Sequence, residues 1–283
     1  MRHFSRIRDV KTFLGRERKK GKKVGFVPTM GALHEGHTSL VKRSVQDNDI
    51  TVCSIFVNPI QFNSQHDLDK YPRNLERDLA FLEESGCDIV FAPDTEEMYP
   101  GGKTEELTVD FGYLDKILEG KYRPGHFRGV AIVVQKLFGI VEPDKAYFGK
   151  KDHQQLLVIR QLVTQLQLPV IVEACPIVRE TDGLAMSSRN MRLTIGERQL
   201  APIIFEVLTH VKDKIGTIPV KELKNWAIKK IEKNPSFKVD YFEISDKETL
   251  LPIENWKSKG NAMALIASYL GDVRLIDNIE FFS

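Results

Sequence analysis

Short apolar runs alternate with longer amphipathic stretches through the first 175 residues, and this alternation constrains the fold more than any other feature. Three runs are almost continuously apolar and rich in Val, Ile and Phe, which is typical of strands covered on both faces. They are VGFVP (24–28), ITVCSIFV (50–57) and DIVFAP (88–93). Between them, residues 37–46 and 71–85 have helical spacing, and Gly86 marks the end of the second helix.

The alternation continues with a buried helix, a strand, a second helix and another strand. These segments are 131–141, 146–148, 152–167 and 169–175. Strands that alternate with helices favour an open, mostly parallel sheet. We therefore predict an α/β fold with a Rossmann-like, doubly wound parallel sheet.

The pattern changes after RETDGLAMSSRN (179–190). Helices are expected from Ile195 and over 220–233, followed by three strands that pair with one another. The strands are 238–246, 263–270 and 273–281. Helices followed by paired strands indicate a smaller α+β domain, so we predict two domains, 1–177 and 178–283.

Charge and cysteine content exclude several protein classes. The net charge is only +2, and the three cysteines are far apart and odd in number, which argues against a disulfide framework and for a reducing compartment. No apolar stretch approaches ~20 residues, and the N-terminus lacks the apolar region of a signal peptide. We expect a cytoplasmic protein with buried cysteines, in which the basic run RERKKGKK (16–23) is a solvated helix end before a strand.

Two histidines stand three residues apart in VPTMGALHEGH, at the turn between a strand and a helix. The zinc motif HExxH needs a spacing of four on one helix face, and Gly36 weakens a helix here, so a zinc site is disfavoured. A helix N-terminus beyond a parallel strand favours anion binding, with Gly31 and Gly36 letting the backbone approach a ligand. The residues alone leave two alternatives open: His34 and His37 contact phosphate, or they cap the helix.

The HxGH string after a strand resembles the adenylyl-transfer superfamily, and MSSRN (186–190) resembles the mobile loop of those enzymes. A wider set of strings, in order along the chain, resembles the pantoate–β-alanine ligase family. They are PTMGALHEGH, FVNPIQF (56–62), YPRNLERD (71–78), EMYPGG (97–102), RPGHFRGV (123–130), KLFGIVEPDKAYFGKKDHQQL (136–156), RETDGLAMSSRN and RLIDN (274–278). The departures from the family pattern are small: Thr38, Ile132 and Met191-Arg192.

The resemblance implies an enzyme that joins (R)-pantoate to ATP as pantoyl-adenylate, releasing pyrophosphate. The amine of β-alanine then attacks the acyl carbon, which gives pantothenate and AMP. It also implies Mg²⁺ as cofactor, a cytoplasmic location and a homodimer. From the low net charge and the lack of a long apolar stretch we expect neither nucleic-acid nor membrane partners. Domain 1–177 would bind ATP and pantoate, and domain 178–283 would carry the closing loop.

The resemblance further implies which residues contact ATP. The catalytic candidates are His37, the usual general acid in similar enzymes, His34 and Lys151, and His37 either transfers a proton or only stabilises charge. Asp152 caps a helix or meets the ribose or Mg²⁺, and Val178 contacts adenine. The complete ATP-binding set is Met30, Gly31, Ala32, Leu33, His34, Glu35, Gly36, His37, Gly149, Lys150, Lys151, Asp152, Val178, Met186, Ser187, Ser188 and Arg189.

Pantoate needs apolar walls and a few amide partners. Gln61 and Gln155 suit its hydroxyls and carboxylate because amides both donate and accept, and Asn58 is expected to support this pocket. Gln154 points elsewhere on a helix and is expected to be structural. Arg123 and Arg128 either contact phosphate or the carboxylate of β-alanine, or serve as scaffold.

Two rival functions remain at this point. A nucleotidyltransferase for a phosphorylated acceptor shares the HxGH turn, but it should carry extra cations for the acceptor phosphate. An RNA-binding relative of the synthetases would use RERKKGKK, which is short and has no interleaved aromatic residues.

Overall fold

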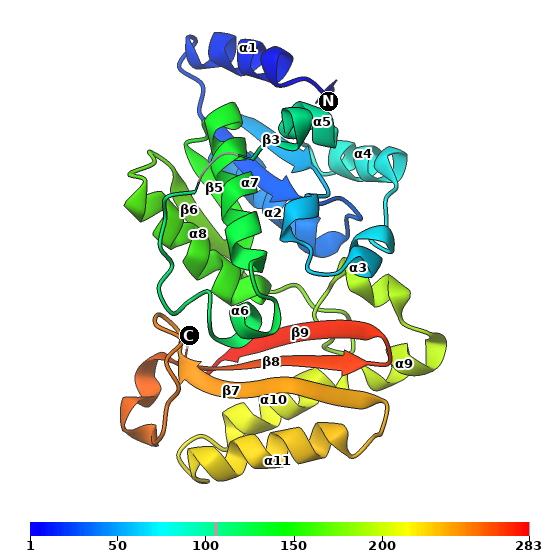
Figure 1. Cartoon of the computed structure of the whole chain (residues 1–283), viewed down its shortest axis with the longest axis vertical. Coiled ribbons are helices and arrows are strands. Elements are labelled where there is room, and N and C mark those ends of the chain that lie inside the picture. Colours follow the sequence, from blue (N-terminus) through cyan, green and yellow to red (C-terminus); the bar gives the residue numbers. More distant parts are fainter. Residues whose placement is uncertain (105–106, 283) are drawn as a thin grey trace. The chain divides into compact units, whose positions relative to one another are not determined.

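The apolar runs form the strands of one parallel sheet in the computed structural model, which describes residues 1–104 and 107–282 (Figure 1). The strand order is β1-β4-β3-β2-β5-β6, and every neighbouring pair is parallel. The strands are β1 (Arg2–Phe4), β2 (Val24–Thr29), β3 (Ile50–Ile55), β4 (Ile89–Phe91), β5 (Lys145–Gly149) and β6 (Ile171–Cys175). The predicted parallel sheet is confirmed, and β1 is an edge strand that the sequence analysis missed.

Helices cover both faces of this sheet. Val27 of β2 packs in one apolar cluster with Leu40 of α2, whereas the ring of its neighbour Phe26 lies 6.3 Å from that of Phe138 in α7. Successive strand residues point to opposite faces, so α2 and α7 lie on different faces and the doubly wound arrangement is confirmed. The helices are α1 (Ile7–Arg18), α2 (Glu35–Asp47), α3 (Gln65–Asp69), α4 (Leu75–Glu84), α5 (Thr95–Met98), α6 (Leu118–Tyr122), α7 (His126–Val141) and α8 (His153–Gln165), with 3₁₀ turns η1 (Pro59–Gln61), η2 (Pro100–Gly102) and η3 (Lys150–Asp152).

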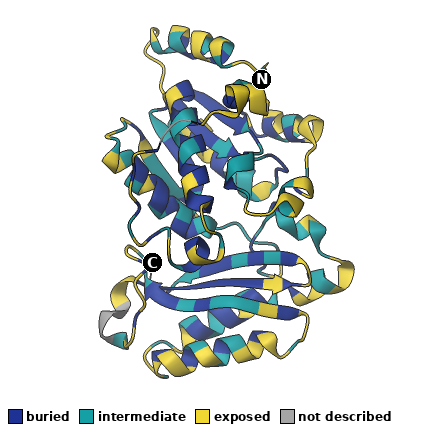
Figure 2. Ribbon diagram, viewed as in Figure 1, coloured by how far each residue is buried: buried dark blue, intermediate teal, exposed yellow. Residues whose placement is uncertain are grey.

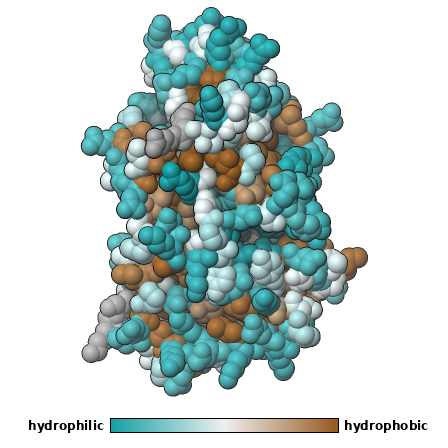
Figure 3. All heavy atoms as spheres, viewed as in Figure 1, coloured by the Kyte–Doolittle hydropathy of each residue, from teal (hydrophilic) through white to brown (hydrophobic). Residues whose placement is uncertain are grey.

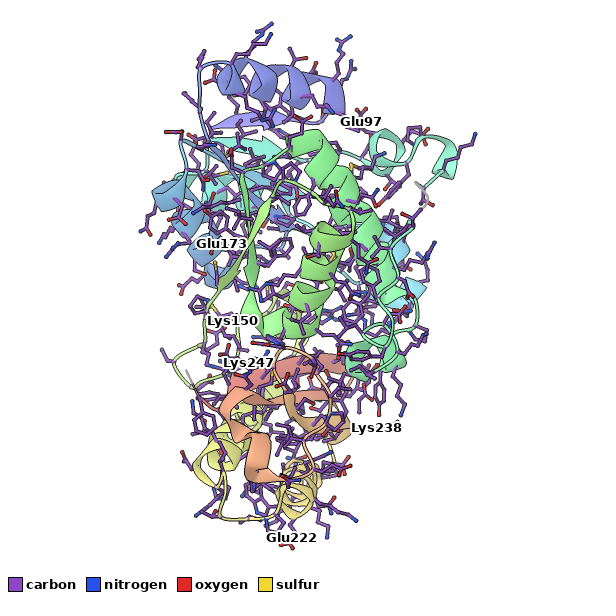
Figure 4. The ribbon with its side chains drawn as sticks, turned by 90° about the vertical axis from the view of Figure 1, so that its left-hand side faces the viewer. Glu97, Lys150, Glu173, Glu222, Lys238 and Lys247 are labelled. Atoms are coloured by element: carbon purple, nitrogen blue, oxygen red, sulfur yellow. The ribbon has the colours of Figure 1, made fainter. Side chains whose placement is uncertain are left out.

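Helix ends follow local signals in the sequence. Asn74 caps α4 by accepting from the Arg77 N–H, so the helix begins at Leu75 rather than at residue 71, and Gly86 after it has a φ of +81°. Helix α1 ends at Arg18 inside the basic run, as expected. Its first backbone N–H, from Ile7, donates to Glu97 (labelled in Figure 4) over 2.8 Å.

The order in which successive strands are added to the sheet reverses at β2, although all strands stay parallel. The chain runs outward from β2 to β3 and β4, and then returns to place β5 on the other side of β2. Ligands of open α/β sheets bind beyond the carboxyl ends of the strands at such a point. The turns that follow β2 and β5 are therefore the first places to search for a site.

Contacts along the backbone divide the chain into two units, and the second consists of Lys151–Gln154 together with the residues from Ile177 onward. Its sheet is antiparallel, with strands β7 (Phe237–Asp246), β8 (Ala262–Leu270) and β9 (Val273–Glu280) in that order. Its helices are α9 (Ile195–Leu200), α10 (Ile203–Asp213) and α11 (Val220–Glu232), with 3₁₀ turns η4 (Ser188–Arg192) and η5 (Trp256–Asn261). The smaller α+β unit is confirmed as a fold. The predicted domains, 1–177 and 178–283, differ from this division in the segment 151–154 and at Ile177.

Apolar residues of α10 and α11 form the core of the second unit with the sheet. Leu208 and Leu223 pack in one cluster with Ile244 and Ile266, and Figure 2 shows this burial as dark blue on the strands and on the sheet-facing sides of the helices. Outside these cores, hydrophilic residues predominate on the face drawn in Figure 3, with separate apolar spots between them. Within the described ranges, no helix combines the length and apolarity needed to cross a membrane. Cys53, Cys87 and Cys175 are free thiols and buried, as predicted.

Candidate active site

The turn after β2 has a backbone that most residues avoid. Gly31 has a φ of +76° and Ala32 one of +51°, so two successive residues are left-handed. A Cβ atom on Gly31 would lie 2.8 Å from Oδ2 of Asp78 and 3.1 Å from Cγ2 of Ile55. Gly31 therefore makes room for a side chain of this protein, and the expected approach of a ligand at this glycine stays a prediction.

A buried carboxylate holds this turn. Oδ2 of Asp78 in α4 accepts the N–H of Ala32 at 2.9 Å, and Oδ1 accepts the N–H of Leu33 at 2.8 Å. Burial raises the pKa of Asp78, and these two hydrogen bonds oppose the rise. The two N–H groups thus bind Asp78 rather than point toward a ligand. The sequence analysis gave Asp78 no role, although it lies in the string YPRNLERD.

His34 and His37 cap helix α2 reciprocally. Nδ1 of His34 accepts the N–H of Gly36 at 3.1 Å, and Nδ1 of His37 accepts the N–H of His34 at 3.4 Å. A neutral ring that accepts at Nδ1 carries its proton on Nε2. In each histidine the cap uses Nδ1, only one of the two ring nitrogens, so capping does not by itself exclude the phosphate contact of the sequence analysis. The ring centroids lie 4.1 Å apart.

The turn after β5 begins at the same edge of the sheet. β5 pairs with β2 through Gly25–Lys145 and Phe26–Ala146, and both strands run in the same direction. Their carboxyl ends therefore bring Gly149 and Lys150 (labelled in Figure 4) to the edge that carries residues 30–37. A Cβ atom on Gly149 would meet nothing within 4 Å, so packing does not require a glycine here.

Asn58 orients Gln61. Nδ2 of Asn58 donates to Oε1 of Gln61 and to the carbonyl of Gly129, both at 3.1 Å, and Oδ1 accepts the Tyr99 hydroxyl at 2.9 Å. The amide of Gln61 is thereby turned so that Nε2 faces Sδ of Met30 at 3.1 Å. Since Asn58 is only 1% exposed, its geometry suits support of Gln61, and the pantoate contact expected for Gln61 stays a prediction.

His126 also supports Gln61, and the sequence analysis missed it. Nδ1 of His126 lies 2.9 Å from the carbonyl oxygen of Gln61, and Nε2 lies 3.0 Å from Nη1 of Arg123, which pairs with Glu119 at 3.7 Å. An arginine only donates, so Nε2 accepts and the Nδ1–H donates to Gln61. This chain of contacts favours the scaffold alternative for Arg123, and Arg128 likewise donates to a main-chain carbonyl at 3.4 Å.

Gln154 and Gln155 differ in burial at the start of α8. Gln154 is 3% exposed, whereas Gln155 is half-buried. Adjacent residues on a helix point in different directions, so this difference fits the expected structural role of Gln154. The structure leaves the substrate contact of Gln155 untested.

The second unit carries the other candidates. Nζ of Lys151 lies 3.7 Å from Oδ2 of Asp152. In the segment that leads to MSSRN, the Met186 N–H donates to the Val178 carbonyl at 3.0 Å, and Ser187 caps η4 by accepting the Arg189 N–H at 3.3 Å. Ser188 is buried. Each unit therefore gathers its own group of candidates: residues 30–37, 58, 61, 149, 150 and 155 in the first, and residues 151, 152, 178 and 186–189 in the second.

Comparison with known proteins identifies similar sequences over nearly the whole chain. The family model described as pantoate-beta-alanine ligase matches residues 2–280. The pantothenate synthetase of Porphyromonas gingivalis is 48% identical over 281 residues, covering 99% of both chains. That of Aquifex aeolicus is 50% identical over 278 residues, covering 97% of both.

Solved structures are similar over the same length. The pantothenate synthetase of Thermus thermophilus has a TM-score of 0.93 and 45% identity, covering 100% of both chains. The pantoate-beta-alanine ligase of Francisella tularensis, solved in complex with beta-gamma ATP and beta-alanine, has a TM-score of 0.82 and 36% identity, covering 99% of this chain and 98% of that one.

Proposed function

This chain belongs to the pantoate–β-alanine ligase family, and from that premise we propose that it condenses (R)-pantoate with β-alanine in an ATP-dependent reaction. It is an enzyme, and its family membership identifies it as a ligase of pantothenate biosynthesis. The proposed reaction proceeds through pantoyl-adenylate. A pantoate carboxylate oxygen attacks the α-phosphorus and pyrophosphate leaves; the amine of β-alanine then attacks the acyl carbon, and AMP leaves.

The histidine pair is the observation that carries this proposal. In the first step an anion must attack a phosphate that is itself negatively charged, so preorganised donors have to lower the barrier. The reciprocal cap fixes both rings at the N-terminus of α2 through their Nδ1 atoms. We propose that His37 and His34 donate to the α-phosphate, that Lys151 neutralises charge on the phosphates, and that catalysis is mainly positioning and electrostatics.

We propose the remaining contacts from the same premise. Gln61 and Gln155 bind the hydroxyls and carboxylate of pantoate, and the hydrogen bond that Gln61 receives from Asn58 supports an oriented amide. The turns 30–37 and 149–152 bind ATP together with Val178 and the segment 186–189. In this assignment residues 1–177 form the domain for ATP and pantoate, and residues 178–283 carry the closing loop.

Mg²⁺ is proposed to enter with the nucleotide. In residues 1–104 and 107–282, no three His, Cys, Asp or Glu side chains are grouped to hold a metal ion. Mg²⁺ at nucleotide sites commonly takes one or two carboxylates besides phosphate and water, and Asp152 beside Lys151 fits the role of one such ligand. When bound, the ion would neutralise phosphate charge. We also propose a homodimer in the cytoplasm, from family membership alone.

A single-turnover assay tests the proposed roles. With ATP, Mg²⁺ and pantoate but no β-alanine, the enzyme should form pantoyl-adenylate, and free AMP should accumulate only when β-alanine is added. His37→Ala and Lys151→Ala should each slow adenylation by ~10²–10³-fold, as expected for the loss of a donor to transition-state charge, with a smaller effect on ATP binding. Gln155→Ala should instead raise the pantoate concentration that the enzyme needs.

Three results would count against these roles. Unchanged adenylation in His37→Ala or Lys151→Ala would remove the electrostatic role of that residue. Normal pantoate affinity in Gln155→Ala would exclude that contact. AMP transfer to a phosphorylated acceptor without pantoate would favour the nucleotidyltransferase alternative.

A further inference from the structure

Two neighbouring residues of β9 hold two different segments of the second unit. Nδ2 of Asn278 donates to the carbonyl oxygen of Lys151 at 2.9 Å. The carboxylate of Asp277 accepts from Nη1 of Arg179 at 2.6 Å and from Nη2 at 3.0 Å. Asn278 and Asp277 are only 3% and 4% exposed, so both side chains are committed to the protein interior.

The Arg179 contact is fixed from several directions. Its guanidinium also donates to the carbonyls of Gly183 and Asn278, both at 3.1 Å, and lies over the ring of Phe205 at 4.1 Å. A guanidinium that binds a carboxylate through two parallel hydrogen bonds has a defined orientation. Arg179 is the first residue of the segment that leads to Ser187 and Arg189. Its contact with Asp277 therefore fixes the start of that segment against β9.

The segment that contains Lys151 has a second anchor. Nε2 of His153 lies 2.6 Å from the carbonyl oxygen of Lys247. Lys247, which is labelled in Figure 4, directly follows β7. These two hydrogen bonds connect residues 151–154 to the rest of the second unit, whereas β5 before them and α8 from Gln155 belong to the first. The main chain that bears the Lys151 side chain is thus tied to β9 and to the end of β7.

We propose that Asn278 is a positioning residue for Lys151, and that β9, through Asn278 and Asp277 together, sets the spacing between Lys151 and the segment 179–189. The inference rests on the proposed function, in which Lys151 and Ser187–Arg189 contact ATP. In this role Asn278 acts through the main chain of Lys151. A displacement of ~1 Å in such a group can lower a rate by ~10²-fold.

Asn278→Ala tests this inference by removing the donor to Lys151. We expect single-turnover adenylation to slow by ~10–100-fold, with a change in kcat that exceeds the change in KM for ATP. Asn278→Asp keeps the shape but replaces the donor with an oxygen that repels the carbonyl, so it should not restore the rate. The matched control is Asn234→Ala, which removes the side-chain hydrogen bond from the Ser236 N–H (2.9 Å) elsewhere in the unit and should leave the rate unchanged.

A double-mutant cycle separates positioning from a purely structural role. If Asn278 acts through Lys151, Asn278→Ala should cause little further slowing in the Lys151→Ala background. Equal slowing in both backgrounds, or a wild-type rate for Asn278→Ala, would overturn the inference.

Hydrogen exchange gives a readout that does not depend on the reaction. Asn278→Ala should accelerate amide exchange at residues 151–153, whereas Asn234→Ala should not. Unchanged exchange would overturn the anchoring itself. If the wild-type enzyme shows slow exchange at residues 151–153 and yet forms no adenylate, that result would overturn the proposed function and the role of Lys151 in it, but not the hydrogen bond from Asn278 to Lys151.

Discussion

At the scale of single residues, the site depends on side chains that fix others. Asp78 holds the backbone of Ala32 and Leu33, and Asn58 holds the amide of Gln61. In both cases a buried polar group has its hydrogen bonds satisfied inside the protein, so its loss would leave its partners unpaired. Such a residue can affect catalysis without reaching the substrate.

Asp78→Asn should loosen the turn that carries the histidines. The amide replaces one accepting oxygen with a donor, which then faces an N–H group, and an unpaired buried N–H costs about 1–3 kcal/mol. We expect a lower melting temperature and slower adenylation. Asp94→Asn, at an exposed cap that accepts the Glu97 N–H at 2.7 Å, keeps its accepting oxygen and is the control. Wild-type stability and rate in Asp78→Asn would contradict the clamp.

At the scale of elements, helix α7 approaches η1 closely enough to exclude a side chain. A Cβ atom on Gly129 would lie 2.5 Å from the carbonyl oxygen of Ile60 and 2.7 Å from Cα of Gln61, whereas one on Gly139 in the same helix would meet nothing within 4 Å. The helix therefore forms part of the wall behind Gln61, and of its two glycines Gly129 is buried against η1 whereas Gly139 is exposed.

Gly129→Ala and Gly139→Ala form a matched pair on α7. Gly129→Ala should push α7 away from η1, lower the melting temperature and raise the pantoate concentration that the enzyme needs. Gly139→Ala should be neutral or stabilise the helix by about 0.5–1 kcal/mol, because alanine loses less backbone freedom on folding. Thermal unfolding and initial rates across a pantoate series measure both effects, and equal behaviour of the two variants would refute this view of α7.

Elements with strong patterns could be predicted from the sequence. The buried strands β2, β3 and β5 were identified because both faces of each are covered, which makes the run of apolar residues continuous. β1 was missed because Arg2–Phe4 is short and lies at the edge of the sheet. Asp78 and Asn278 lay within strings that resemble the family, but nothing in the local sequence indicates which distant backbone group a buried carboxylate or amide will bind.

At the scale of the whole molecule, the three thiols report on folding. Burial raises the pKa of Cys87 to about 12 and also raises those of Cys53 and Cys175. Once unfolded, the thiols titrate near 9.0, so above that pH the unfolded chain binds fewer protons than the folded one. Stability is therefore lost as the pH rises from about 9, by up to about 1.4 kcal/mol per pH unit for each thiol.

Melting temperatures between pH 7 and 10 test this linkage. The wild type should melt at progressively lower temperature above pH 9, and Cys87→Ala should show a shallower decline, whatever its melting temperature at pH 7. At neutral pH a thiol reagent should label none of the three cysteines until the chain unfolds. Parallel pH profiles of the two proteins, or rapid labelling of the folded protein, would contradict the burial of these groups.

The discontinuity of the second unit restricts how this chain can be recombined. A chimaera joined at residue 176 would import β9 with its asparagine but keep the host's residues 151–154, so donor and acceptor of one hydrogen bond would come from different parents. Transplanting both pieces together keeps the two partners of this bond from one parent. For the same reason, a fragment that begins at Ile177 would lack Lys151, whose main-chain carbonyl accepts the hydrogen bond from Asn278.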